Sequence, residues 1–205
     1  FDSTSGSSGR AVDDDNEGLN DEDGIATIAA LSVLDTSYQL EASVTNGDTS
    51  NNARVLAWID FDQNGRFDED ERATLASGGA SPVAVTGTYT IAPNSSGTVL
   101  LNWVSLPGIV GNETYLRVRI STDPSFVEGS SGGSSEDSAS TGTASNGEVE
   151  DYAVAVQGVD FGDAPANFNG LSAGGYDDSF AAVTGIDSNL FLGATVPDPD
   201  TGRFG

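Results

Sequence analysis

Short segments in which apolar and polar side chains alternate are the feature that most restricts the fold of this sequence. In residues 38–45 every second residue is apolar, and a similar alternation recurs in residues 83–91 and 114–121. Successive side chains of a β-strand point to opposite faces of a sheet, so this period indicates strands with one buried face. Further strand candidates, separated by clusters of Gly, Asn, Asp and Pro, are residues 25–33, 53–61, 98–104 and 148–157. No segment of useful length has the period of a helix, and we therefore predict an all-β fold, an antiparallel β-sandwich over about residues 25–157.

The composition changes twice along the 205 residues and predicts three regions. Residues 1–24 form an acidic, Ser/Gly-rich lead-in, residues 25–158 contain the sandwich with its loops, and residues 159–205 form an extended Gly/Asp-rich C-terminal segment. The low-complexity stretch 128–146 is expected to be a mobile loop between two strands. Because the first residue is Phe1 rather than Met, we expect the chain to be a processed or excised piece of something longer.

The charge of the chain is strongly negative and excludes several classes of function. There are 32 acidic and 7 basic residues, a net charge of −25, and His and Cys are absent. Without His or Cys the chain forms no zinc finger, cysteine nucleophile or Ser-His-Asp triad, and its charge repels nucleic acids and anionic membranes. No apolar run approaches the roughly 20 residues of a membrane span. Bound divalent cations, high salt or partial disorder are three ways to offset such self-repulsion.

One acidic segment has the spacing of a calcium-binding loop. Residues 60–71 read D-F-D-Q-N-G-R-F-D-E-D-E, with Gly65 at the sixth position, where EF-hand-type loops turn sharply. Calcium takes six to eight oxygen ligands, which such a loop supplies from alternate positions. The expected ligands are the side chains of Asp60, Asp62, Asn64, Asp68 and Glu71 and the carbonyl of Arg66. The segment before the loop is strand-like, which favours a structural ion over a sensor site; the alternative is an ordinary acidic surface loop.

Other groups of residues allow a functional and a structural interpretation. Glu148, Glu150 and Asp151 are either ligands of a second cation, partners of Arg117 and Arg119, or solvated edge charges. The acidic cluster 13–23, with Asp21 and Asp23 as the expected ligands, either holds one or two cations or is a disordered linker. Four aromatic residues belong to a sugar-stacking platform or, as we favour, to the strands of the sandwich: Trp58, Tyr89, Trp103 and Tyr115.

Three motifs together resemble a known family. They are W-I-D-F-D-Q-N-G-R-F-D at 58–68, Y-L-R-V-R-I-S at 115–121 and G-E-V-E-D-Y at 147–152, preceded by N-D-E-D-G-I at 20–25. Their combination resembles the GEVED domain of large secreted and surface proteins of bacteria, often repeated in adhesin-like chains. The resemblance implies an extracellular, calcium-binding β-sandwich without catalytic activity. It supports the ligand positions in residues 60–71 and, more weakly, Glu148, Glu150 and Asp151.

The C-terminal segment resembles the start of a further repeat of the same family. D-F-G-D-A-P at 160–165 and L-G-A at 192–194 are the residues that carry this resemblance. Either the chain is cut across repeat boundaries, or the segment docks on a neighbouring subunit and builds a fibre. In the second case the apolar anchors are Leu190, Phe191, Leu192 and Val196, and Asp160 and Asp163 are candidate ligands at the joint.

These observations predict a calcium-stabilised, secreted or cell-surface structural or adhesive module, not an enzyme. Ca²⁺ is the expected cofactor, and the expected partners are neighbouring copies or adjacent repeats, with surface glycans as a further candidate and without nucleic acid or membrane insertion. The alternative is a calcium-dependent carbohydrate-binding domain. A glycoside hydrolase has little support, because among 32 acidic residues a suitably spaced carboxylate pair can always be found.

Overall fold

The computed structural model describes residues 23–75, 89–107, 109, 112–127, 134–161, 183–186 and 189–197. The predictions made for Asp21, Asp163 and residues 76–88 lie outside these residues. The strands are β1 (Leu31–Ser32), β2 (Ser37–Asn46), β3 (Ala53–Ile59), β4 (Thr74–Leu75), β5 (Tyr89–Ile91), β6 (Ser95–Val104), β7 (Glu113–Ser121), β8 (Glu148–Gln157), β9 (Val159–Phe161) and β10 (Val183–Gly185). Two short helical turns complete the described elements, the 3-10 turn η1 (Glu69–Glu71) and α1 (Ser138–Thr141).

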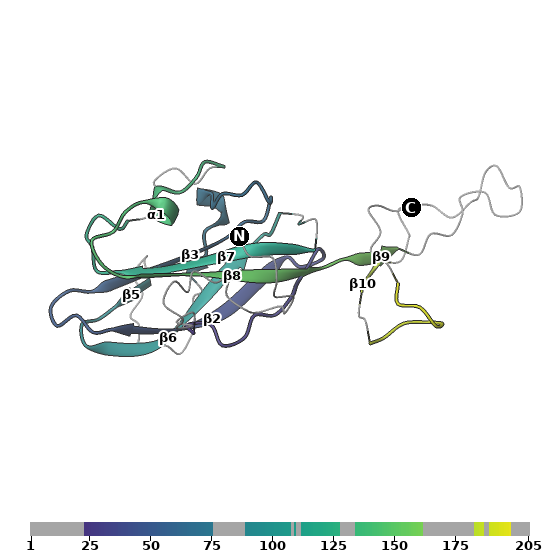
Figure 1. The fold of residues 1–205 in the computed structure, drawn as a ribbon, viewed down its shortest axis with the longest axis horizontal. Helices are drawn as coiled ribbons and strands as arrows, with labels where there is room; N and C mark the ends of the chain where they lie inside the picture. Colours follow the sequence, from purple (N-terminus) through teal and green to yellow (C-terminus); the bar gives the residue numbers. More distant parts are fainter. Residues whose placement is uncertain are drawn as a thin grey trace, which may run out of the picture.

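Two sheets face each other across one core, as the alternation predicted. The larger sheet has the order β1-β8-β7-β3-β5 and the smaller the order β2-β6-β4 (Figure 1). Neighbouring strands are antiparallel except β1 and β8, which pair in parallel over two residues. The all-β class is therefore confirmed, and one parallel edge pair is added to the antiparallel arrangement.

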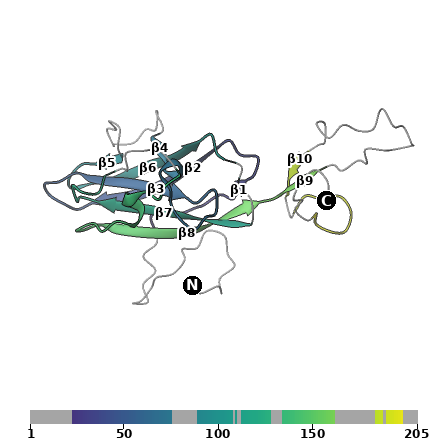
Figure 2. The same ribbon diagram turned by 90° about the horizontal axis from the view of Figure 1, so that it is seen from above.

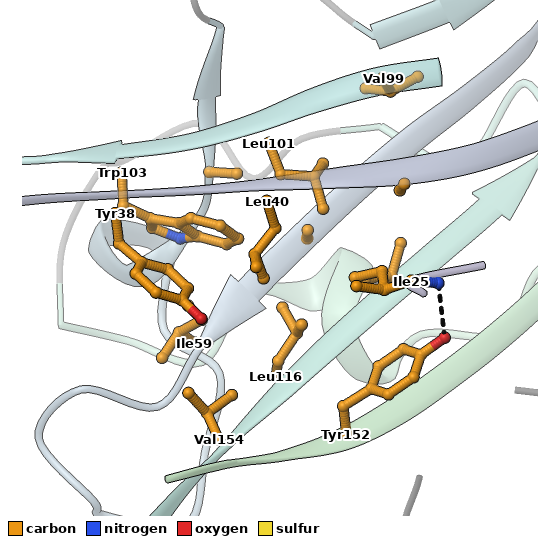
Figure 3. Packing of buried hydrophobic residues seen from close by; sticks show 14 of the residues in the cluster. Ile25, Tyr38, Leu40, Ile59, Val99, Leu101, Trp103, Leu116, Tyr152 and Val154 are labelled. Carbon is orange, nitrogen blue, oxygen red and sulfur yellow. Dashed lines mark hydrogen bonds between the residues drawn. The ribbon is translucent and has the colours of Figure 1, made fainter. Parts of the chain in front are cut away.

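The core between the sheets is built from alternate residues of the long strands. In β2 the side chains of Tyr38, Leu40 and Ala42 are buried, whereas the residues between them are exposed. They meet Leu116 of β7 and Val154 of β8 from the opposite sheet in one cluster (Figure 3). The period-2 interpretation of these segments is therefore confirmed.

Strand β3 departs from the simple alternation because both of its faces are buried. Val55, Ala57 and Ile59 point into the main core, and the intervening Leu56 and Trp58 belong to a second cluster with Phe126 and Ala139. That second cluster lies on the outer face of the larger sheet, under the segment that contains α1 (Figure 1). A strand covered on both sides is the most firmly held part of a sheet, and the acidic loop begins at its end.

Two local predictions need correction. Only Leu31–Ser32 of the predicted strand 25–33 is a strand, because this segment meets the edge of β8 over just two residues. The described part of the stretch 128–146 is not a loose connection: Asp137 and Ser140 are buried, and α1 packs on the larger sheet. Small Ser and Ala residues, which resemble a linker in composition, here allow a close approach to the sheet.

The chain beyond β8 leaves the sandwich at one end. Strands β9 and β10 form a hairpin that continues from β8 away from the two sheets (Figures 1 and 2). The side chains of Leu190 and Leu192 that follow it are 79% and 100% exposed. Within the described ranges, no helix has both the length and the apolar composition to cross a bilayer.

Candidate metal centre

The acidic loop is positioned by the end of β3 and closed by η1. Asp60 follows the buried β3 directly, and its backbone N–H donates to the carbonyl of Tyr115 on β7. The chain then turns through two residues with positive φ, Gln63 at 57° and Gly65 at 78°. Glycine adopts this conformation without a steric penalty, so the prediction of a sharp turn at Gly65 is confirmed.

Three of the predicted carboxylates converge. One oxygen each of Asp60, Asp62 and Glu71 lies within 4.8 Å of the other two. Asp60 accepts hydrogen bonds from the backbone N–H groups of Asn64 and Gly65, at 3.1 and 3.0 Å, which fixes its carboxylate inside the turn. Burial raises the pKa of Asp60 above its usual value, and these two hydrogen bonds offset part of that rise. The loop therefore brings together negative charges that repel one another and are partly removed from water.

Asp68 adds a buried carboxylate with an unsatisfied oxygen. Its side chain is 2% exposed, and Oδ2 accepts a hydrogen bond from Asn64 Nδ2. Within the part of the chain that the structure describes, Oδ1 of Asp68 is the buried side-chain oxygen or nitrogen that has no hydrogen-bond partner. A buried anionic oxygen without a partner costs free energy, so this atom marks a place where a positive group fits.

Glu71 holds the loop closed. Its Oε1 accepts from the backbone N–H of Phe61 and Asp62, and Oε2 accepts from that of Asp68. Burial raises the pKa of Glu71 to about 7, although these hydrogen bonds act in the opposite direction. Both oxygens thus accept hydrogen bonds from the backbone, and the role of Glu71 as a calcium ligand stays a prediction. Each carboxylate oxygen retains further acceptor capacity.

Asn64 lies between two of the carboxylates. Its Nδ2 donates to Asp62 Oδ2 at 3.0 Å and to Asp68 Oδ2 at 3.1 Å, and its Oδ1 accepts from the N–H of Arg66. The amide therefore places its positive end where the charges converge. Rotation of the amide would turn Oδ1 to the same place, so the residue suits a loop that holds a cation. The side chains of all five predicted ligands are thus linked in one network, and the Arg66 carbonyl remains a prediction.

The segment 134–141 packs directly against this loop, which the sequence did not predict. Backbone N–H groups of Glu69 and Asp137 donate to the carbonyls of Ser135 and Phe67. The carboxylate of Asp137 accepts from the indole of Trp58 and pairs with Arg72, and it caps the first turn of α1. The one available signal was an Asp before Ser-Ala-Ser, the composition of a helix N-cap. The partners of Asp137, Trp58 and Arg72, are distant in the sequence, so this local signal could not predict them.

The second group of predicted ligands, Glu148, Glu150 and Asp151, is divided between the two faces of β8. Asp151 forms a two-point ion pair with Arg117, on the outer face. Glu150 is buried on the other face, where it accepts hydrogen bonds from Gly24 N–H and the Tyr152 hydroxyl. The structure therefore does not bring Glu150 and Asp151 into one site. Of the alternatives for Asp151, the arginine partner is the one present.

Glu148 and the exposed Asp23 lie on the same side as Glu150, where all three line a cavity between the sheets. Arg119, the other expected partner of this group, instead donates to the carbonyl of Ala139 and lies over the ring of Phe126. Trp58 and Trp103 are 0% and 2% exposed, so the interpretation of both tryptophans as core residues is confirmed.

The fold and the loop define a class of protein: an all-β sandwich module with an oxygen-rich acidic loop at the end of a central strand. Residues 54–155 match the family model described as GEVED domain, so this part of the chain is a GEVED domain. The match includes the acidic loop and the whole G-E-V-E-D-Y motif at 147–152, and it confirms the resemblance seen in the sequence. No curated protein and no solved structure matched the chain.

Proposed function

We propose that this protein is a calcium-stabilised extracellular structural or adhesive module without catalytic activity, and that it serves as a head-to-tail building block of a surface fibre or repeat adhesin. Two observations carry the calcium role: the converging carboxylates of Asp60, Asp62 and Glu71, and the buried, unpartnered Oδ1 of Asp68, whose other oxygen shares the Asn64 amide with Asp62. A cation held there supplies the charge that these oxygens otherwise lack.

The chemistry of the donor set favours calcium among the common metals. The candidate ligands offer carboxylate, amide and backbone oxygens, and the chain contains no His or Cys. Oxygen donors suit hard cations, and the loop spacing matches the larger, more flexible coordination of calcium rather than the octahedron of magnesium. Asp60, Asp62, Asn64, Asp68 and Glu71 are the side chains that would hold the ion, and Glu71 also braces the loop.

The surroundings of the loop suit a structural ion. The loop begins at the end of β3, which is buried on both faces, and ends in the single turn η1. EF-hand sensors respond to calcium by changing the angle of a helix pair, and neither flank of this loop is a helix of that kind. Binding free energy then adds directly to folding free energy. Partial neutralisation of a chain with a net charge of −25 works in the same direction.

The alternative, a calcium-dependent carbohydrate-binding domain, has less support. A sugar platform needs exposed aromatic faces, and the two tryptophans of the chain are buried. The structural role therefore accounts for more of the acidic loop and of its packing against residues 134–141.

Calcium binding is tested by isothermal titration of the full chain and by thermal unfolding in calcium and in chelator. At calcium 100-fold above the Kd we expect about 2.7 kcal/mol of added stability, which raises Tm by roughly 5–10 °C for a chain of this size. Asp60→Asn is expected to lose most of this shift. Asp48→Asn is the matched control, because it removes one negative charge from an exposed turn away from the loop. Identical melting curves with and without calcium would contradict the proposal.

A further inference from the structure

We propose that the apolar segment 189–197 of one copy docks into the cavity between the sheets at the opposite end of a second copy. The inference rests on the proposed building-block function and names the two surfaces that it requires. Both surfaces lie within the described residues, and they are placed at opposite ends of the same strand, β8.

The receiving surface is a cavity of about 320 Å³ that opens between the two sheets. Its apolar lining comes from three strands of the two sheets: Val44 of β2, Val55 of β3, and Val118 and Ile120 of β7. Val44 and Ile120 are partly buried hydrophobic residues at the margin of the main core. The volume lies in the range of cavities that hold small ligands, so it accommodates a few apolar side chains.

The docking segment exposes an unusual amount of apolar surface for its length. Leu190, Phe191, Leu192 and Val196 are 79%, 38%, 100% and 42% exposed. Four such side chains within seven residues concentrate exposed apolar surface in one short segment, and exposed apolar surface of this kind is a usual mark of an interaction site. In addition, no residue from 189 to 196 is ionisable.

Charge favours this segment as the occupant of the cavity. Asp23, Glu148 and Glu150 contribute carboxylates to the cavity lining. An acidic segment of a neighbouring copy would be repelled there, and acidic residues outnumber basic ones by 32 to 7 in this chain. An uncharged segment avoids this repulsion, and its backbone N–H groups are suitable donors to oxygens of the lining.

The two surfaces lie at opposite ends of the molecule. The cavity is lined by Glu148 and Glu150, at the beginning of β8, whereas the hairpin β9–β10 follows its last residue, Gln157. Figure 1 shows this hairpin projecting beyond the end of the sandwich, along the direction of β8. A ten-residue strand is roughly 33 Å long, and this length separates the two surfaces.

The hairpin keeps Leu190 and Leu192 of the segment from reaching the cavity of their own copy. Ile186 N–H donates to the carbonyl of Gly158 at 3.1 Å, which ties the chain to the far end of β8. From Ile186, Leu190 is four residues away and Leu192 six, which span at most about 14 and 22 Å. Glu150 lies eight residues from Gly158 along the extended strand, about 26 Å. While the hairpin is formed, only the cavity of a second copy is accessible to these side chains.

Such a contact joins two different surfaces and therefore does not close by itself. Each added copy offers a fresh cavity at one end and a fresh segment at the other, so repeated docking produces a filament. The described residues thus contain both halves of one self-complementary joint.

The test uses the full chain in calcium, followed by sedimentation velocity and negative-stain microscopy. Leu192→Asp blocks the segment, and Val44→Phe or Ile120→Phe fills the cavity. Leu34→Asp is the control, because Leu34 is also exposed, at 51%, but belongs to neither surface. We expect wild type and Leu34→Asp to form filaments, and each blocked variant to associate at least roughly tenfold more weakly, as the loss of one buried leucine implies.

Mixing the blocked variants gives the decisive result. Leu192→Asp keeps an intact cavity and Val44→Phe an intact segment, so the mixture is expected to form 1:1 dimers that do not grow. These dimers would also prove that both variants are folded. Filaments of either variant alone, or a mixture of folded variants that stays monomeric, would overturn the docking inference. Wild type that remains monomeric would overturn the building-block role itself, whereas calcium titration of the same samples tests the metal role separately.

Discussion

The indole Nε1 of Trp58 donates a hydrogen bond to Oδ2 of Asp137 at 3.1 Å, across 79 positions of the sequence. The same oxygen pairs with Arg72, and the side chain of Asp137 is fully buried. This contact fixes the segment 134–141 on the outer face of β3, beside the acidic loop. The loop and this segment therefore form one packed unit.

Removal of the Asp137 carboxylate is expected to loosen this unit. Asp137→Ala deletes the acceptor of the Trp58 indole, the ion pair with Arg72 and the cap of α1. Breaking a buried ion pair costs roughly 3–5 kcal/mol, and the partial exposure of Arg72 favours the lower end of this range. Urea unfolding in calcium measures the loss. Asp70→Ala is the control, since Asp70 is exposed and bonds only to the Ser134 hydroxyl among the described contacts. Equal losses of stability in the two variants would argue against a special role of Asp137.

The effect of Asp68→Asn on the free energy of unfolding is expected to be neutral or stabilising without calcium and destabilising with it. Without calcium the substitution removes a buried carboxylate whose Oδ1 has no partner, so the free energy of unfolding should stay the same or rise by about 1 kcal/mol. With calcium the variant lacks a ligand charge, so it should be less stable than wild type and bind the ion at least about tenfold more weakly. Thermal unfolding with calcium and with chelator tests both signs. A variant that is destabilised equally in both conditions would indicate that Asp68 acts only in packing.

Asp151→Asn is expected to affect stability without changing the number of ions bound. Asp151 pairs with Arg117 at two points, on the opposite face of β8 from Glu150, and Arg117 also lies over the ring of Phe67. The pair is partly exposed, so its loss should cost only about 1 kcal/mol. Calcium stoichiometry from isothermal titration should equal that of wild type. One fewer bound ion would return Asp151 to the set of metal ligands.

Tyr152→Phe is expected to release the chain at residues 23–25. The buried hydroxyl of Tyr152 donates to Glu150 at 2.6 Å and accepts from the N–H of Ile25 at 3.1 Å (Figure 3). Leaving these groups without their partner costs roughly 1–3 kcal/mol. Hydrogen exchange should show faster exchange at Ile25. Tyr115→Phe is the matched control, because its hydroxyl meets only the exposed Glu113 among the described contacts; similar losses in both variants would contradict the assigned anchor.

Much of the sandwich could be predicted from local pattern. Alternation in residues 38–45 and 114–121 identified the buried faces of β2 and β7, because the strand period of two is a property of the backbone. The acidic loop was also predictable, since its candidate ligands lie within twelve consecutive residues and converge by local turns. The weak points were segments whose structure depends on a distant partner, such as residues 25–33 and 134–141.

By itself, the sequence determined the long strands, which side of each is apolar, and where the carboxylates of the acidic loop converge, because all of these depend on neighbours a few positions away. Only the tertiary structure decided what covers the outer face of β3, that Asp151 pairs with Arg117 while Glu150 holds Gly24, and that the exposed C-terminal leucines lie far from their own cavity. These contacts join residues that the chain separates widely, and their partners are fixed by how the two sheets pack together.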